Sequence, residues 1–242
     1  MLSYYLFILK HKHSGARVML MYVCSLVLLN LELFVMDVEV KEIIAINGLC
    51  MLFWGIISGF LLYYHGRQES LNLILQAKYY DHITKIPNYN SLLNDSYLLL
   101  KKKTKISLLL INIDRFKDIN KLYGTDFGDR VLVEVASTLT TLVKDYGKVY
   151  RLSGDSFCVI SMNENLQRMV TISEKIRLAI DIKELFYDNN KIKLAVSIGG
   201  YYGDTESKKI DDYLEIAQEN LFDSKMAGRN RIVINNRMVF YS

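Results

Sequence analysis

The chain has 242 residues, enough for one large domain or for one domain of ordinary size with an appendage. One proline and 13 glycines exclude a long disordered linker. The net charge of +4 is compatible with a phosphate ligand or a membrane surface. The mean hydropathy of +0.12 is high for a soluble α/β protein, so the composition predicts a membrane portion joined to a mildly basic domain.

Two apolar stretches in the first quarter of the chain are each long enough to cross a bilayer as a helix. They cover about 17–36 and 43–64, and the segment 37–42 between them is net acidic. Basic residues flank the pair on its outer sides: Lys10, Lys12, Arg17 and Arg67. The positive-inside rule places both ends in the cytoplasm. The sequence therefore predicts a two-pass membrane anchor over 1–66, with the remaining chain cytoplasmic.

Other interpretations of the first stretch remain open. A secretory signal peptide is one, although no small-residue cleavage site stands before a polar segment. Glu32 is either a functional intramembrane carboxylate or a residue near the outer interface, one turn from Asp37. The opening run 2–9 is too short to cross and is expected to lie at the interface. Three cysteines without CxxC spacing are expected to be structural thiols: Cys24, Cys50 and Cys158.

The polarity changes after the second stretch. Leu71, Ile74, Leu75 and Tyr79 recur at helical spacing, which predicts a connecting helix over 67–80. This helix would either couple the membrane segment to the following domain or serve as a rigid stalk.

Strand-like and helix-like stretches alternate in the remainder, 81–242. Strands are predicted over 106–113, 149–152, 156–161, 192–201 and 231–234. Helices are predicted over 128–146, 166–182 and 210–226. A hairpin around Ser153-Gly154-Asp155 interrupts the alternation, which excludes a simple doubly wound sheet. The expected fold is therefore α/β, with a ferredoxin-like core and an extended mixed sheet.

Four separated blocks resemble the GGDEF family of diguanylate cyclases. In chain order they are DHITKIPN over 81–88, the segment 112–132, SGDSF over 153–157 and SKMAGRNR over 224–231. The resemblance covers about 81–234 and implies a nucleotidyl-cyclase-like fold. Family members join two GTP molecules into c-di-GMP, with each of two facing domains presenting one nucleotide. The chain is thus expected to carry a degenerate GGDEF domain, because SGDSF replaces GGDEF.

The resemblance also implies a nucleotide site. It assigns guanine recognition to Asn120 and Asp129, whose amide and carboxylate suit a Watson–Crick edge. It assigns phosphate binding to Lys225 and Arg229, which a spacing of four on a helix is expected to place on one face. Lys117, in an expected loop, also matches the family. The alternatives are helix caps for the first pair and a solvated helix end for the second.

The departures from the family fall on its Mg²⁺ site. Asn112 replaces the first carboxylate of the D-x-D motif, and Asp114 retains the second. Ser156 replaces the second acid of the hairpin, whereas Asp155 retains the first and is the candidate base. An amide in place of a carboxylate weakens Mg²⁺ binding. The remaining candidate ligands are therefore Asp114 and Asp155, which would bind Mg²⁺ only weakly. The leading hypothesis, a protein without cyclase activity, requires no cofactor.

The family's inhibitory R-x-x-D motif is replaced as well. Lys144 and Gly147 occupy its ends, so no inhibitory product site is expected.

The resemblance implies a bacterial cell membrane as the location of the anchor. The leading hypothesis is a membrane-anchored regulatory or scaffold protein without cyclase activity, which acts in c-di-GMP signalling or exopolysaccharide production. It would bind GTP and act on a partner protein, for which the resemblance suggests a membrane glycosyltransferase; no nucleic-acid partner is expected. The alternative is an active diguanylate cyclase that works as a homodimer. A third hypothesis is a membrane sensor that binds a small ligand between its helices.

Overall fold

The computed structural model describes residues 21, 23–28, 30–32, 39–101, 104–162, 164–188, 190–206 and 209–239. The chain separates into two compact units, Met1–Ile74 and Leu75–Ser242. The described residues of the N-terminal unit are almost all helical, and the C-terminal unit is an α/β domain. Each unit is described by itself below.

The main element of the N-terminal unit is α3, Val40–Tyr79, whose last turns belong to the C-terminal unit. This helix of 40 residues runs without a break over the second predicted span and the predicted connecting helix. Its most apolar window has a mean hydropathy of 2.0, and it is the one helix of the described residues that is long and apolar enough to cross a membrane.

Much of the first predicted span, 17–36, and all of the run 2–9 lie outside the described residues. Within that span, a shorter apolar helix occupies Val23–Glu32. Asn30 and Asn47 join this segment to α3 by reciprocal amide hydrogen bonds, with nitrogen–oxygen distances of 2.8 and 3.3 Å.

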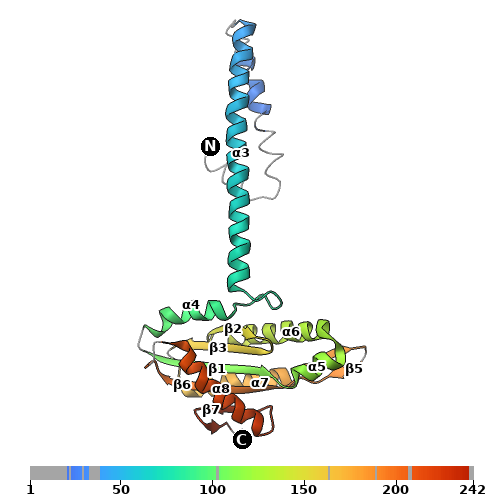
Figure 1. The fold of residues 1–242 in the computed structure, drawn as a ribbon, viewed down its shortest axis with the longest axis vertical. Coiled ribbons are helices and arrows are strands. Elements are labelled where there is room, and N and C mark those ends of the chain that lie inside the picture. The colour runs from blue at the N-terminus through green and yellow to red at the C-terminus, as the bar shows by residue number, and fades with distance from the viewer. Residues whose placement is uncertain are drawn as a thin grey trace. The chain divides into compact units, whose positions relative to one another are not determined.

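The C-terminal unit is built on a six-stranded sheet with the order β2-β3-β1-β6-β7-β8 (Figure 1). β1 pairs antiparallel with both β3 and β6, whereas β7 runs parallel to β6. The four strands β2-β3-β1-β6 have the arrangement of a ferredoxin-like core, and the parallel β7 makes the extended sheet mixed. The elements are α4 (Tyr89–Leu100), β1 (Lys105–Ile113), α5 (Phe116–Tyr123), α6 (Thr125–Val143), β2 (Lys148–Ser153), β3 (Ser156–Met162), α7 (Leu166–Asp181), β4 (Leu185–Tyr187), β5 (Asn190–Ile192), β6 (Val196–Asp204), α8 (Ile210–Met226), β7 (Ile232–Ile234) and β8 (Arg237–Met238).

Helices cover both faces of this sheet. Alternate residues of β1, such as Leu109 and Ile111, join one core cluster with α6 and α7. The intervening residues Leu108 and Leu110 join a second cluster with α4 and α8. The sequence of β1 is almost continuously apolar because both faces of this strand are buried. The predicted α/β fold with a mixed sheet is confirmed.

Several predicted elements differ in detail. The predicted strand 192–201 is two strands: β5 ends at Ile192 in a separate hairpin with β4, and β6 begins at Val196. Residues 115–117 were expected to form a loop, but Phe116 and Lys117 begin α5 and Arg115 is its N-cap. Cys158 is buried in β3, as expected, whereas Cys24 is exposed and Cys50 is partly exposed in the described chain.

Candidate functional site

The first part of the site is the corner where β1 ends beside the β2–β3 hairpin. Asn112 lies directly opposite Ser156 in the β1–β3 register. The Asn112 amide nitrogen donates a hydrogen bond to the Ser156 hydroxyl at 3.0 Å. The two residues that replace family acids are therefore partners, and Asn112 is only 7% exposed. Each neutral side chain supplies part of the other's hydrogen bonding.

The hairpin turn places Asp155 next to this corner. Gly154 has φ +51°, a left-handed conformation that glycine adopts without steric strain. The Asp155 backbone carbonyl accepts a hydrogen bond from the Ile113 amide at 3.2 Å, and Asp155 is partly buried. The turn of the signature hairpin is thereby held against the last residue of β1.

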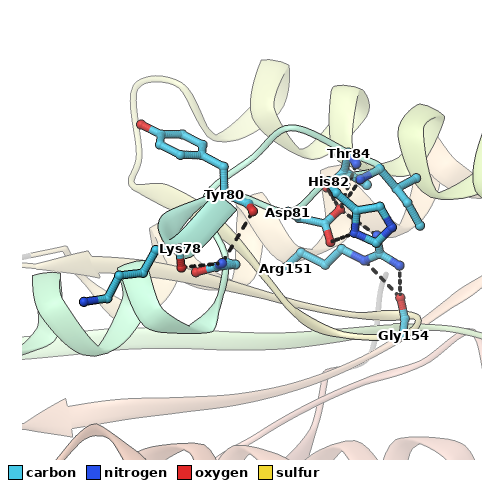
Figure 2. A network of polar contacts seen from close by, with 9 residues as sticks. Lys78, Tyr80, Asp81, His82, Thr84, Arg151 and Gly154 are labelled. Carbon is cyan, nitrogen blue, oxygen red and sulfur yellow. Dashed lines mark hydrogen bonds and ion pairs between the residues drawn. The ribbon is translucent and has the colours of Figure 1, made fainter. Parts of the chain in front are cut away.

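The buried Arg151 connects the hairpin turn to Asp81, as Figure 2 shows. Arg151 donates through Nη1 to Asp81 Oδ1 at 2.6 Å and through Nη2 to the Gly154 carbonyl at 2.7 Å. Asp81 also accepts from the Thr84 amide at 2.8 Å and the Thr84 hydroxyl at 2.7 Å. Burial alone would raise the pKa of Asp81, but the hydrogen bonds from Thr84 and Arg151 outweigh it, so the pKa lies below its usual value.

Asp114 follows β1 and already has a partner for each of its carboxylate oxygens. Oδ1 accepts from the Ser197 hydroxyl at 2.7 Å, and Oδ2 accepts from the Asn230 backbone amide at 2.9 Å. The side chain is 9% exposed. The surviving acid of the D-x-D motif is thus bound into the fold in this structure.

The residues present do not make a carboxylate-rich cation site. Asn112 and Ser156 are neutral and bonded to each other, and Asp114 serves two protein donors. Among the described residues, there is no group of three or more His, Cys, Asp or Glu side chains placed to hold a metal ion. Mg²⁺ prefers charged oxygen ligands, so this donor set does not fit it well.

The predicted guanine position lies at the junction of α5 and α6. The Asn120 side-chain oxygen is buried and has no hydrogen-bond partner among the described residues. Gly128 lies against it, since a Cβ built on Gly128 would stand 1.8 Å from that oxygen. Asp129 is exposed one residue further along α6. Neither residue caps a helix, because the N-cap of α6 is Gly124 and Asp129 lies within α6.

The predicted phosphate residues do not share a helix face. Lys225 lies in the last turn of α8, but α8 ends at Met226. Arg229 has φ +62° in the turn that follows, after Gly228 with φ +113°. The prediction of a pair four apart on one helix is therefore wrong, because Gly228 ends the helix before Arg229. Lys117 is exposed in the first turns of α5.

Arg229 also lines an open groove of about 800 Å³. Its other cationic lining residues come from separate segments: Arg115, Lys121, Lys191 and Lys193. Asn120, Asp129, Lys117 and Lys225 are not among the lining residues. Arg229 therefore shares this groove with cations near α5 and with Lys191 of β5 and Lys193 after it, and the sequence pattern gave no sign of these last two.

The domain thus combines a ferredoxin-like sheet, a signature hairpin beside β1, and an asparagine whose side-chain oxygen is buried at the following helix junction, which is the arrangement expected of a nucleotidyl-cyclase-like domain. Residues 78–231 match the family model described as "Diguanylate cyclase, GGDEF domain". This match spans more than half of the chain, and the chain belongs to the GGDEF family. Its membership places it in c-di-GMP signalling.

Curated relatives resemble this chain over part of their length. It is 36% identical to diguanylate cyclase A of Treponema denticola over 137 residues. This aligned segment covers 56% of this chain and 36% of that protein. It is also 36% identical over 163 residues to an uncharacterized membrane protein of Staphylococcus aureus, covering 64% of this chain and 46% of that protein. The chain therefore spans less than half the length of these relatives.

Solved structures share the fold. The coiled coil and GGDEF domain of DgcB from Caulobacter crescentus, in complex with c-di-GMP, has a TM-score of 0.68 at 23% identity and covers 74% of this chain and 97% of that one. The diguanylate cyclase SiaD from Pseudomonas aeruginosa, in complex with its activator SiaC, has a TM-score of 0.63 at 22% identity and covers 93% and 92% of the two chains.

Proposed function

We propose that this protein is a membrane-anchored regulatory GGDEF protein that binds GTP without converting it to c-di-GMP. The observation that carries the proposal is the contrast between the Asn112–Ser156 hydrogen bond and the unpartnered, buried oxygen of Asn120. The first replaces two acids expected at a cation site. The second is a buried polar atom that lacks a hydrogen-bond partner among the described residues.

The absence of cyclisation follows from the charge at the corner. Phosphoryl transfer depends on cations that neutralise the phosphates and on the alignment of the attacking and leaving oxygens. With Asn112 and Ser156 neutral, the remaining carboxylates are Asp114, which serves Ser197 and Asn230, and Asp155. In our proposal, Asp155 lacks the cation that a base at this position would need, and Mg²⁺ is not required for GTP binding.

Retention of GTP binding rests on Asn120. A buried carbonyl-type oxygen without a partner costs about 1–3 kcal/mol, which a donor on the ligand would recover. Guanine presents N–H donors along its Watson–Crick edge. Asp129 adds an exposed carboxylate acceptor one residue after Gly128. Lys117, Lys225 and Arg229 supply the positive charge that we assign to the phosphates.

The two-pass topology belongs to the same proposal. The apolar length of α3 accounts for one crossing. The second crossing is supported by Asn30, which exchanges hydrogen bonds with Asn47 of α3. Within lipid, an asparagine pair of this kind satisfies polar groups that would otherwise be unpaired and joins two helices. Both ends of the hairpin would then face the cytoplasm.

We further propose that the domain acts through a partner protein. A membrane glycosyltransferase of exopolysaccharide production is the partner that the family resemblance suggests. The SiaD structure contains a protein activator, SiaC, so a related fold binds a protein regulator. Isolation of the chain from native membranes should recover a stoichiometric companion, and recovery of the chain alone would remove this part of the proposal.

An active cyclase is the second candidate function, favoured by the identity of 36% to diguanylate cyclase A. Calorimetric titration of the full chain in lipid nanodiscs with GTP, with and without Mg²⁺, tests the leading proposal. We expect binding of similar affinity under both conditions, and loss of binding in Asn120→Ala. Binding that requires Mg²⁺ would favour the active cyclase. Undetectable binding under both conditions would reject the nucleotide site altogether.

A further inference from the structure

Asp114 and Asn230 connect two segments that are far apart in the sequence. The Asp114 carboxylate accepts the Asn230 backbone N–H at 2.9 Å across 116 residues of chain. Its other oxygen is held by the Ser197 hydroxyl of β6 at 2.7 Å. The Asp114 amide is itself bonded to the Ala195 carbonyl at 2.9 Å. The carboxylate therefore has a fixed position from which to hold Asn230.

The Asn230 side chain provides two additional connections, both to α7. Its Oδ1 accepts from Arg177 at 3.1 Å, and its Nδ2 donates to Asp181 at 3.2 Å. Asn230 is thus bonded through its backbone to the end of β1 and through its side chain to α7. The Arg229 backbone amide donates to the Ser224 carbonyl of α8 at 3.3 Å, so Asn230 adds a second set of connections to this turn, to β1 and to α7.

The backbone around Arg229 is in a costly conformation. Gly228, Arg229 and Asn230 have φ of +113°, +62° and +46° in succession. Left-handed backbone is uncommon for residues other than glycine, and it persists where surrounding contacts enforce it. Asn230, whose backbone amide donates to Asp114, is the residue directly after Arg229. The bond from the Asn230 amide to Asp114 therefore holds this turn from the β1 side, while the Arg229 amide holds it to the Ser224 carbonyl of α8.

We propose that Asp114 is a positioning residue for the nucleotide's phosphates: by holding the Asn230 amide, it fixes the turn that presents Arg229. This inference rests on the proposed GTP binding and assigns Asp114 a role other than that of a cation ligand. It also explains why an acid is retained at position 114 while Asn112 and Ser156 are neutral. An aspartate acting only by its charge would repel phosphate, so its removal would strengthen binding.

Two substitutions of Asp114 distinguish the effect of its hydrogen bonds on GTP binding from the effect of its negative charge. Both Asp114→Ala and Asp114→Asn remove the negative charge, but asparagine keeps one oxygen to accept the Asn230 amide and an NH₂ group that can donate to the Ser197 hydroxyl. We expect Asp114→Ala to weaken GTP binding by about tenfold, the equivalent of one lost buried hydrogen bond. Asp114→Asn should stay within about threefold of the wild type. Equal affinities of the two variants would overturn the proposal.

A second comparison asks whether the effect passes through Arg229. In an Arg229→Ala background, Asp114→Ala should cause no additional loss of GTP affinity, because the residue that it positions is already absent. Additive losses would contradict this route. Asp118→Asn serves as the matched control, since Asp118 is an exposed carboxylate that lines the same groove. Its removal should leave GTP affinity unchanged or slightly stronger.

Hydrogen exchange tests the same bond without nucleotide. The Asn230 amide lies outside any helix or strand, yet it should exchange slowly in the wild type and in Asp114→Asn, and rapidly in Asp114→Ala. Rapid exchange in the wild type would overturn the proposal even if the alanine variant did not fold. If the wild type failed to bind GTP but its Asn230 amide were protected as expected, the proposed function would fall, and Asp114 would keep only the role of holding the turn.

Discussion

The β1–hairpin corner and the α5–α6 junction lie in one domain, but their buried polar atoms differ in a way that bears on function. At the corner, the Asn112 amide and the Ser156 hydroxyl are bonded to each other at 3.0 Å. At the junction, the Asn120 oxygen is buried with no partner among the described residues. Polar groups that satisfy each other have less capacity left for a ligand, whereas an orphaned group gains when a ligand supplies its partner. This contrast is the basis of our proposal that the chain binds GTP without converting it.

The largest expected effect on stability concerns the ion pair that holds the β2–β3 hairpin beside the corner. Arg151→Met should lower the free energy of unfolding by about 3 kcal/mol, because it leaves Asp81 without its buried partner and frees the Gly154 carbonyl. Chemical denaturation monitored by circular dichroism measures this. Lys148→Met is the matched control, since the Lys148–Asp95 pair is more exposed and should contribute less than about 1 kcal/mol. Similar losses for the two variants would remove the special role of Arg151.

The same ion pair predicts a pH dependence. The pKa of Asp81 is lowered in the folded state, so its stabilisation is present above the unfolded pKa near 3.8 and is lost as the pH falls through the lower folded value. The difference in stability between wild type and Asp81→Asn should therefore be constant near neutral pH and shrink below about pH 4. A difference that persisted unchanged into this acidic range would contradict the assignment.

A single substitution at Gly128 should block access of GTP to the Asn120 oxygen at the α5–α6 junction. Gly128→Val should abolish GTP binding and destabilise the domain by about 1–3 kcal/mol, because a Cβ at this position meets the Asn120 oxygen at 1.8 Å. Gly154→Ala provides a control at a glycine whose Cβ would meet no atom within 4 Å, although its φ of +51° adds backbone strain. GTP titration should show binding in this control. Binding that survived Gly128→Val would place the nucleotide elsewhere.

The β1–hairpin corner can be restored to its acidic form. Asn112→Asp combined with Ser156→Glu should produce measurable c-di-GMP from GTP with Mg²⁺ or Mn²⁺, whereas either single change should leave at most a trace. Two carboxylates provide the charged oxygen ligands that Mg²⁺ favours. Mass spectrometry of the reaction products detects the change. Continued inactivity of the double variant would show that dimer contacts or other geometry also differ from those of active relatives.

The smallest expected effect comes from breaking the neutral pair. Ser156→Ala removes one hydrogen bond to Asn112 and should cost about 0.5–1.5 kcal/mol of stability. GTP affinity should remain within about twofold of the wild type, because the corner and the junction act independently in our account. A large loss of GTP affinity would show that the two regions are coupled.

Much of the fold could be predicted from apolar periodicity. The predicted helix 210–226 coincides with α8, and the predicted strand 106–113 matches β1 within one residue. α4 was missed, although Asn88 after the single proline is an N-cap that accepts from the Ser91 amide. The helical pairing of Lys225 with Arg229 was wrong because Gly228 after Ala227 is a helix-ending signal, which the spacing of four ignored.

The site was less predictable than the fold. Residue types in the motif blocks indicated Asn112, Asn120 and Ser156, but not that Asn112 bonds to Ser156. The bond between Asp114 and Asn230 joins residues 116 positions apart, and it depends on the left-handed turn after α8. Spacing along the chain carries no information about such contacts, because they arise only when the sheet brings the two segments together. The two-helix anchor and the partner stay predictions.

The most direct test of the central claim is the fate of GTP in the presence of the unmodified full chain. Purified protein in lipid nanodiscs would be incubated with saturating GTP and either Mg²⁺ or Mn²⁺, and the nucleotides would be quantified by mass spectrometry. Our account predicts that GTP is recovered intact. Formation of c-di-GMP over several turnovers per chain would contradict it and establish an active cyclase despite Asn112 and Ser156.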